Sequence, residues 1–401
     1  MSGGDASEVD RRALGSVAVQ FFANGATYAT IVPRLPDIRD RVGISIGALG
    51  LILTIGSLAS LAGSLLTGRV VGVVGSRRVL IYGAVLSIGF LPVIGFATTP
   101  VVLAIGLFGL LFFDVFIDVA MNVQGSAISA RRHTPVMNRL HGLWSLGTVA
   151  GGVVTVLLLR AGVSTPVQLT AVALVLVGAL MFVAPGLLRR DEAPELAESA
   201  RAVTARPRRR ATGLVEIALG AGGATAMAIE MANGDWASFR LTDDLGAAPG
   251  VAGAAFLVFT AGMTVGRLSG DWIQVRVGRD RLVRAAAVTS FVGALLATLV
   301  ASVPVAITGF LIGGLGCSVF FPQLYDQAAR SQAAVGSGFA TMLVGQRGSG
   351  MVVPLIVGGL ANTAALDVGQ AMAIVIVPST IVMFLTTLVP TTVTGEVGPP
   401  T

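Results

Sequence analysis

FFDVFIDVAMNVQG, residues 112–125, places two carboxylates within an apolar run of about 20 residues, the length that crosses a bilayer as a helix. Asp114, Asp118 and Asn122 lie four residues apart, so they form one polar stripe on an otherwise apolar helix. An ionised side chain at the centre of a membrane costs at least about 2.5 kcal/mol, and such residues usually face a bundle interior or a water-filled path. We therefore expect the stripe to lie on a pathway through the protein.

The composition is that of a polytopic membrane protein. Of the 401 residues, 54% are hydrophobic and 12% are charged, whereas soluble domains carry about 25% charged residues. The first dozen residues are polar, and the first apolar run is too long for the core of a signal peptide. We expect that run to be the first membrane span and not a cleaved leader.

Residue counts exclude several function classes. The single cysteine, Cys317, excludes a disulfide framework, and two histidines are too few for a zinc site. Every basic residue is arginine, so the lysine of the ATPase phosphate-binding loop and lysine Schiff-base chemistry are both missing. No serine, histidine and acid arrangement points to an enzyme, and no segment is large enough for the output domain of a sensor. We expect no enzyme activity, no metal, no cofactor and no nucleic-acid partner.

Twelve apolar runs are long enough to span a membrane. They lie near residues 14–33, 46–67, 79–98, 100–123, 138–159, 166–188, 212–235, 249–268, 283–302, 304–325, 338–360 and 369–389. The expected fold is therefore an all-α membrane protein with twelve transmembrane helices.

The longest polar interruption divides six spans from six. The expected parts are an N-terminal six-helix bundle (1–188), an arginine-rich cytoplasmic linker (189–211), a C-terminal six-helix bundle (212–390) and a disordered cytoplasmic tail (391–401). With the linker and both termini in the cytoplasm, 21 of the 27 arginines lie inside, as the positive-inside rule requires. We expect a multi-pass protein of the cytoplasmic (inner) membrane with both termini in the cytoplasm.

The two halves repeat weakly. The matching residues lie after the second and eighth spans (Gly68-Arg69 with Gly266-Arg267) and in the fifth and eleventh spans (Gly142 and Gly147 with Gly345 and Gly350). This pattern predicts two pseudo-symmetric six-helix bundles with a site between them at mid-depth. The alternative is two unrelated bundles joined by a linker.

The loops GRVVGVVGSRR (68–78) and GRLSGDWIQVRVGRDR (266–281) resemble the Gly-x-x-x-Asp-(Arg/Lys)-x-Gly-(Arg/Lys)-(Arg/Lys) signature of the major facilitator superfamily. The acid of such a loop can cap a helix while its arginines pair with carboxylates. The first copy has Gly72 where the acid is expected. The gating candidates are Arg69, Arg77, Arg78, Arg267 and Asp271. Each arginine has an alternative role as a plain positive-inside residue.

Four motifs together resemble the YbjJ-like inner-membrane proteins of that superfamily, relatives of fucose permease. They are the opening stretch, RLHGLWSLGTVAGG (139–152), EMANGDW (230–236) and PRLPDIRDRVG (33–43). The similarity runs over nearly the whole chain. It implies a twelve-helix, proton-driven carrier of a small polar solute, with fucose-type sugars as the nearest cargo. Fucose permease has carboxylates on its first and fourth spans, whereas the first span here has none.

The resemblance implies that the first, fourth, seventh and tenth spans line the cavity. The candidate substrate-binding residues are Gln20, Asn24, Tyr28, Asn122, Trp144, Asn233 and Gln323. Amide side chains donate and accept in fixed directions, which suits a hydroxyl-rich ligand. The alternative for each amide is a hydrogen bond between helices, and for Trp144 it is packing.

The proton-coupling candidates are Asp114, Asp118, Glu230 and Arg347. Burial disfavours the charged form of a carboxyl group, so Asp118 or Glu230 is expected to carry the proton. Arg347 is the one basic residue within a span, and it is the expected counter-charge to a carboxylate. The alternative is a structural ion pair.

These features together predict a monomeric secondary active transporter that moves a small, sugar-like solute by alternating access with proton symport. The alternative is a proton-coupled efflux antiporter of drugs or metabolites on the same scaffold. Exporters of the superfamily carry Gly-Pro-x-x-Gly-Gly in the fifth span. Residues 147–152 here read GTVAGG, with the glycines but without the proline, which favours import.

Overall fold

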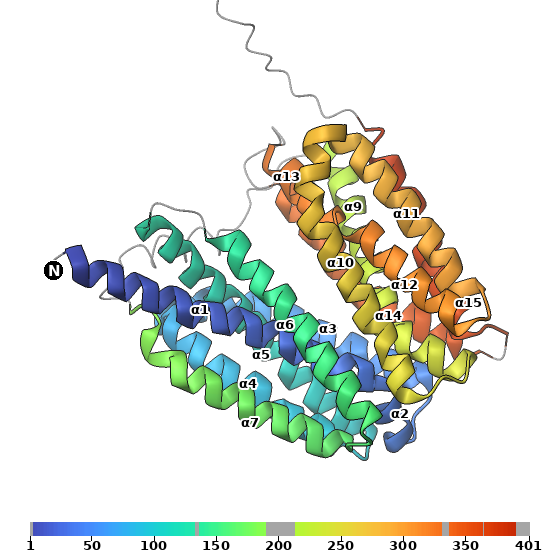
Figure 1. Ribbon diagram of the computed structural model, residues 1–401, viewed down its shortest axis with the longest axis horizontal. Helices are drawn as coiled ribbons and strands as arrows, with labels where there is room; N and C mark the ends of the chain where they lie inside the picture. Colours follow the sequence, from blue (N-terminus) through green and yellow to red (C-terminus); the bar gives the residue numbers. More distant parts are fainter. Residues whose placement is uncertain (1–2, 133–135, 190–212, 331–336, 364, 390–401) are drawn as a thin grey trace, which may run out of the picture. The chain divides into compact units, whose positions relative to one another are not determined.

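The computed structural model describes residues 3–132, 136–189, 213–330, 337–363 and 365–389 (Figure 1). Regular structure in these ranges is entirely helical. Eleven of the described helices are long and apolar enough to cross a membrane. The predicted all-α membrane fold is confirmed.

The chain divides into two compact units. The first comprises residues 1–205 and 241–257, and the second comprises 206–240 and 258–401. Residues 241–257 belong with the first unit, where the Arg39 guanidinium donates to Asp243 (Nη2–Oδ1 3.0 Å). Apart from Arg189, the predicted linker and tail lie outside the described residues, so the predicted domain boundaries stay a prediction.

The first unit contains seven α-helices and two short 3-10 helices. They are α1 (Gly3–Ile31), η1 (Val32–Arg34), α2 (Leu35–Val42), α3 (Ile46–Val74), α4 (Ser76–Gly95), α5 (Pro100–Arg131), α6 (Met137–Arg160), α7 (Thr165–Val183) and η2 (Ala184–Gly186). Helix α6 packs along α1, α5 packs against both α3 and α4, and α7 covers α4. These contacts place α1, α4, α5 and α7 around a common interior.

Helix α1 lies outside the set of eleven apolar helices. Gln20, Asn24, Thr27 and Tyr28 lower its hydropathy, and they recur at helical spacing. The helix packs inside the first unit against α5, α6 and α7. It is therefore the polar-striped span that the sequence places at 14–33.

The second unit repeats this arrangement. It contains α9 (Leu214–Phe239), the first residue of the π-helical turn η3 (Arg240–Asp244), most of α10 (Pro249–Val277), α11 (Arg279–Leu299), α12 (Val303–Cys317), α13 (Phe320–Arg330), α14 (Ser337–Ala361) and α15 (Val368–Thr386). Helix α14 packs along α9, as α6 does along α1, and α12 packs along α11. The predicted tenth span is broken into α12 and α13 at residues 318 and 319.

Helix ends follow from local sequence. The Thr99 hydroxyl accepts from the Val102 amide at the start of α5, where Pro100 occupies the first helical position. Gly75 and Gly278 have positive φ and end α3 and α10 within the two loop-signature segments. The two copies of the signature therefore share a helix break as well as their arginines.

Glycines allow the closest helix contacts in each unit. A Cβ on Gly25 would overlap the Trp144 carbonyl oxygen, and one on Gly147 would overlap that of Phe22, so α1 and α6 meet backbone to backbone. Gly223 and Gly345 make the equivalent contacts between α9 and α14. The same interval, 198 residues, separates Gly25 from Gly223 and Gly147 from Gly345.

This interval corrects one sequence match. Gly68 and Gly266 are also 198 residues apart, so the loop signatures have the register seen in the helix contacts. The counterpart of Gly345 is therefore Gly147, and the match of Gly142 with Gly345 is wrong. An added Cβ on Gly142 or Gly350 would meet nothing within 4 Å, so close helix packing does not require glycine at either position.

Candidate functional site

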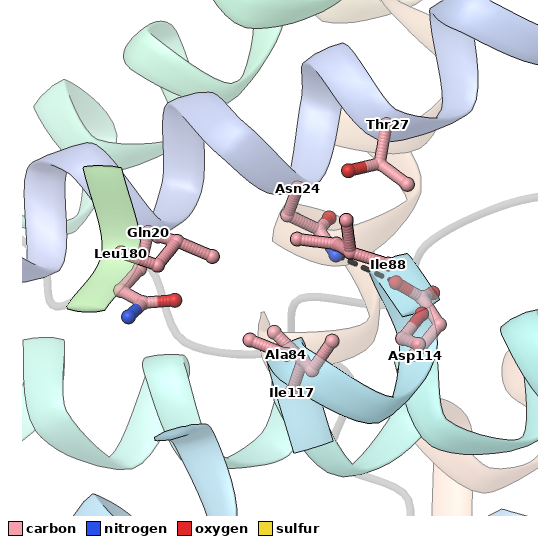
Figure 2. A pocket seen from close by; sticks show the side chains of 9 residues that line it. Gln20, Asn24, Thr27, Ala84, Ile88, Asp114, Ile117 and Leu180 are labelled. Atoms are coloured by element: carbon pink, nitrogen blue, oxygen red, sulfur yellow. Dashed lines mark hydrogen bonds between the residues drawn. The ribbon is translucent and has the colours of Figure 1, made fainter. Parts of the chain in front are cut away.

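Asn24 of α1 connects two helices of the first unit. Its Nδ2 donates to Asp114 Oδ1 of α5 at 2.6 Å, and its Oδ1 accepts from Trp144 Nε1 of α6 at 2.8 Å (Figure 2 shows the first contact). All three side chains are half-buried. The structure thus joins three residues that the sequence analysis nominated separately, and we call them the Trp–Asn–Asp chain.

The donor and acceptor roles in this chain are fixed by chemistry. An indole N–H can only donate, so the oxygen of the Asn24 amide must face Trp144 and its NH2 group must face Asp114. Asp114 Oδ1 must therefore act as an acceptor. A proton bound to Asp114 would lie on Oδ2, the oxygen that Asn24 does not contact.

The polar stripe of α5 divides into two parts. Asp118 and Asn122 lie further along the helix, where Asn122 Nδ2 donates to the Asp118 carbonyl oxygen (2.8 Å) and to its carboxylate (3.1 Å). Asp118 is exposed, whereas Asp114 is half-buried and is tied to another helix. The equal spacing in sequence therefore hides two different environments.

A pocket lies beside Asp114, entirely within the first unit. It is lined by Gln20, Asn24, Thr27, Ala84, Ser87, Ile88, Asp114, Ile117 and Leu180 (Figure 2). Gln20, Asn24 and Thr27 leave α1 on the side that faces Asp114 and Ile117. Gln20 is 1% exposed, and its amide oxygen and nitrogen have no hydrogen-bond partner among the described residues.

The second unit holds its carboxylate differently. Glu230 Oε2 of α9 pairs with Arg267 Nη2 of α10 at 3.4 Å, and each side chain is 26% exposed. Asn233 is buried one turn further along α9 and donates to its own helix at Ile229. The carboxylate in this unit therefore has a fixed counter-charge, whereas Asp114 forms no ion pair with a described basic side chain.

Gln323 lies on α13, beyond the break in the tenth span. Its Nε2 donates to Gln274 Oε1 near the end of α10 at 2.6 Å, and the neighbouring Gln327 accepts from Arg279 of α11. This pair joins the ends of three helices of the second unit. Tyr28, the remaining candidate on α1, is 38% exposed, and its ring lies 6.5 Å from that of Phe256.

The role of Arg347 as a counter-charge stays a prediction. Arg347 is exposed and forms no ion pair with a carboxylate among the described side chains, whereas Arg267, a gating candidate, pairs with Glu230. A mid-span position alone does not show which acid an arginine meets.

The other gating candidates remain without a visible partner in the described part of the molecule. Arg69 and Arg78 are exposed and Arg77 is half-buried, and none pairs with a described carboxylate. The side chain of Asp271 lies outside what the structure describes. A latch at these loops stays a prediction.

Sequence reasoning missed Thr27 and Ser87. Thr27 lies three residues after Asn24 on the same face of α1, so its spacing carried a signal. Ser87 is a lone hydroxyl in an apolar span, which is common in membrane helices and gave no such signal. Only the packing of α4 against α5 brings Ser87 to the pocket.

Known proteins match the chain over most of its length. A family model described as Major Facilitator Superfamily matches residues 17–218. An uncharacterized MFS-type transporter of Yersinia pestis is 31% identical over 355 residues, which cover 85% of this chain and 88% of that protein. The membrane protein MosC of Rhizobium meliloti is 27% identical over 375 residues, with 92% and 88% covered.

Several solved structures share the fold. The nucleoside transporter NupG has a TM-score of 0.70 at 12% identity, covering 94% of this chain and 97% of its own. A D-xylose-proton symporter has a TM-score of 0.71 at 13% identity, covering 94% and 96%. The E. coli fucose:proton symporter FucP has a TM-score of 0.57 at 13% identity, covering 94% and 97%. The chain belongs to the Major Facilitator Superfamily, and it is a multi-pass membrane transporter.

Proposed function

We propose that this transporter moves a small, hydroxyl-rich solute by alternating access and is driven by protons that bind at Asp114. The observation that carries the proposal is the Trp–Asn–Asp chain, which ends on a carboxylate without a basic partner among the described residues. The solved structures of the same fold include a nucleoside transporter and two sugar-proton symporters, which supports this substrate class.

Asp114 is a better proton carrier than the two other candidate acids. Glu230 has Arg267 beside it, so it can remain ionised without a proton. Asp118 is exposed and accepts from Asn122, so water and an amide stabilise its charge. Asp114 is half-buried with one neutral donor, so neutralisation by a proton relieves the largest uncompensated charge of the three.

Through the Trp–Asn–Asp chain, solute binding would also change the hydrogen bonding of Asp114. A solute hydroxyl or carbonyl that accepts the Trp144 N–H would take it from Asn24. The Asn24 amide could then rotate, which would change the hydrogen bond that it donates to Asp114. Proton affinity and solute occupancy are thereby linked through one amide, and this linkage is reciprocal.

A substrate screen in proteoliposomes with an imposed pH gradient tests the proposal. The wild type should accumulate its solute only with the gradient, and Asp114→Asn should exchange solute without accumulating it. Asp118→Asn is the matched control, because it removes an acid one turn away on the same helix and should retain accumulation.

Accumulation by Asp114→Asn that follows the gradient would contradict proton coupling at this residue. The direction of the pH gradient that drives accumulation also distinguishes symport from antiport by an exporter. We further propose that the protein is a monomer of the cytoplasmic membrane with both termini in the cytoplasm, on the basis of its arginine distribution.

A further inference from the structure

Residues 241–257 are joined at both ends to the second unit, yet they pack with the first. The chain enters them after Arg240 in the turn η3 and leaves them at Leu257 within α10, and the flanking residues on both sides belong to the second unit. The residues between belong to the first unit. We call residues 241–257 the crossing segment.

Two residues of η3 show this divided attachment. Arg240 is 3% exposed, and its guanidinium donates to the carbonyl oxygens of Ala297 (3.4 Å) and Val300 (3.1 Å) in the second unit. Three residues later, Asp243 accepts from Nη2 of Arg39 on α2 at 3.0 Å and also pairs with Nη1. A single π-helical turn, a rare form often found at functional sites, is therefore bound to both units.

The crossing segment meets α6 through glycines. A Cβ on Gly250 would lie 3.5 Å from the Cα of Arg160, so the start of α10 lies directly against the end of α6. A Cβ on Gly253 would lie 3.0 Å from Leu159 and 3.5 Å from Val156. Small residues allow such close approach of two helices and place few side chains between them.

Phe256 of the crossing segment lies beyond the Trp–Asn–Asp chain. Its ring is 6.5 Å from the ring of Tyr28, and a Cβ on Gly152 would lie 3.7 Å from it. Tyr28 is one turn beyond Asn24 on α1, and Gly152 is two turns beyond Trp144 on α6. Since α1 and α6 both run toward the predicted outer side, Phe256 lies on that side of the Trp–Asn–Asp chain.

The attachment to the second unit limits what the crossing segment can do when the units move. Helix α10 is continuous from Pro249 to Val277 (Figure 1), so its start cannot remain on α6 while the rest of the helix moves away. At the other end, Arg240 binds the second unit. Alternating access moves the two halves of a carrier against each other. The crossing segment must therefore leave the first unit in part of the cycle.

We propose that the crossing segment is a gate on the predicted outer side, which is closed in this structure and is held shut by the pair between Arg39 and Asp243. The inference rests on the proposed function only in assuming alternating access. It assigns gating roles to two residues far from the loop signatures, and it makes breakage of their ion pair a step of the transport cycle.

A reporter cysteine beneath the gate tests the proposal without a solute. Val156 is 5% exposed and faces Gly253, so Val156→Cys places a small thiol at the closed contact. The purified full chain in detergent is treated with a charged maleimide, and the labelling rate measures how often the contact opens. The native Cys317 is 2% exposed, and the parent protein gives its background rate.

Two acids beside Arg39 provide matched variants of the reporter protein. Asp243 reaches Arg39 from the crossing segment, whereas Asp40 pairs with it from the same helix at 2.7 Å. Asp243→Asn should speed labelling roughly tenfold, the factor for losing one charge-assisted hydrogen bond. Asp40→Asn should leave the rate unchanged. The charge exchange Arg39→Glu with Asp243→Arg should slow labelling again, which distinguishes a lost pair from a misfolded variant.

The side to which the gate opens is tested in intact cells. A membrane-impermeant maleimide should label Val156→Cys from outside, and more rapidly when Asp243→Asn is also present. Labelling that requires permeabilisation would overturn the gate on the outer side.

Equal labelling rates of the reporter protein with and without Asp243→Asn would overturn the role of the ion pair. This outcome is separable from that of the proposed function, because labelling requires neither a solute nor a pH gradient. A gate that opens as expected, without uptake driven by a pH gradient, would refute proton coupling alone. Uptake driven by a pH gradient, with labelling that ignores Asp243, would refute this gate alone.

Discussion

The Trp144 side chain has a single hydrogen-bonding group, the indole N–H, and this group orients Asn24. Replacement by phenylalanine keeps an aromatic ring in the same place but removes the N–H. The Asn24 amide would then be free to turn its oxygen toward Asp114, which favours the protonated acid over the carboxylate. Trp144 does not contact Asp114, but it is expected to control whether Asp114 is protonated or ionised.

Trp144→Phe should uncouple solute movement from the proton gradient. We expect gradient-driven accumulation in proteoliposomes to fall roughly tenfold, the effect of losing about one hydrogen bond near a charge, while solute exchange at equal pH persists. Phe21→Leu on α1 is a control for altered packing between α1 and α6, because the Phe21 ring contacts the ring of His141 on α6, and it should keep accumulation. Equal losses of accumulation and exchange in Trp144→Phe would instead indicate a structural role, or a contact with the solute that contributes to binding and not to proton coupling.

The spacing of Asp114, Asp118 and Asn122 correctly predicted a polar stripe, but it could not rank the two acids. Their difference depends on Asn24, which is on another helix, and on the neighbours that expose Asp118. Arg347 shows the same limit. Sequence gives the depth of a residue in a span, whereas the side of the helix that meets a carboxylate depends on how whole helices pack.

At the scale of helices, the contact between α1 and α6 depends on glycine. Gly147 meets the Phe22 carbonyl oxygen so closely that one methyl group would force the two backbones apart. Gly345 makes the equivalent contact between α9 and α14. The glycine-rich sequence predicted close packing in both spans, but only the contacts identify which glycines are the counterparts.

Gly147→Ala should destabilise the protein by about 1–3 kcal/mol, the usual penalty for overpacking a tight contact. Gly142→Ala on the same helix should be neutral or stabilising by up to about 1 kcal/mol, because its added methyl meets nothing within 4 Å and alanine favours a helix. Thermal unfolding in detergent compares them. Equal midpoints for the two variants would show that α1 and α6 can separate without loss, and the close contact would have no role in stability.

At the scale of the whole molecule, the fold was predictable because membrane spans need long apolar runs with internally satisfied backbones. The break of the tenth span into α12 and α13, and the grouping of residues 241–257 with the first unit, were not predicted. The break was not predicted because the hydropathy of the tenth span is continuous through it. The grouping of residues 241–257 was not predicted because it depends on contacts between residues distant in sequence.

The arginines on the predicted outer side stabilise the ends of helices. Arg34 and Arg240 are each 3% exposed and donate to backbone carbonyls and side chains within their own units. Arg41 donates to the Gly95 carbonyl oxygen. These charges hold helix ends together, as Arg131 does on the predicted cytoplasmic side by pairing with Asp10, so the proposed orientation depends on the number of arginines on each side.

Cysteine labelling tests this orientation, because the native Cys317 is 2% exposed. Thr98, between α4 and α5, and Ala130, near the end of α5, are both exposed and lie at opposite ends of one helix. In intact cells a membrane-impermeant maleimide should label Thr98→Cys, and it should label Ala130→Cys only after permeabilisation. The parent protein controls for Cys317. The reverse pattern would place the arginines beside Ala130 outside, against the rule that sets topology, and would invert the direction of every gradient assigned to this transporter.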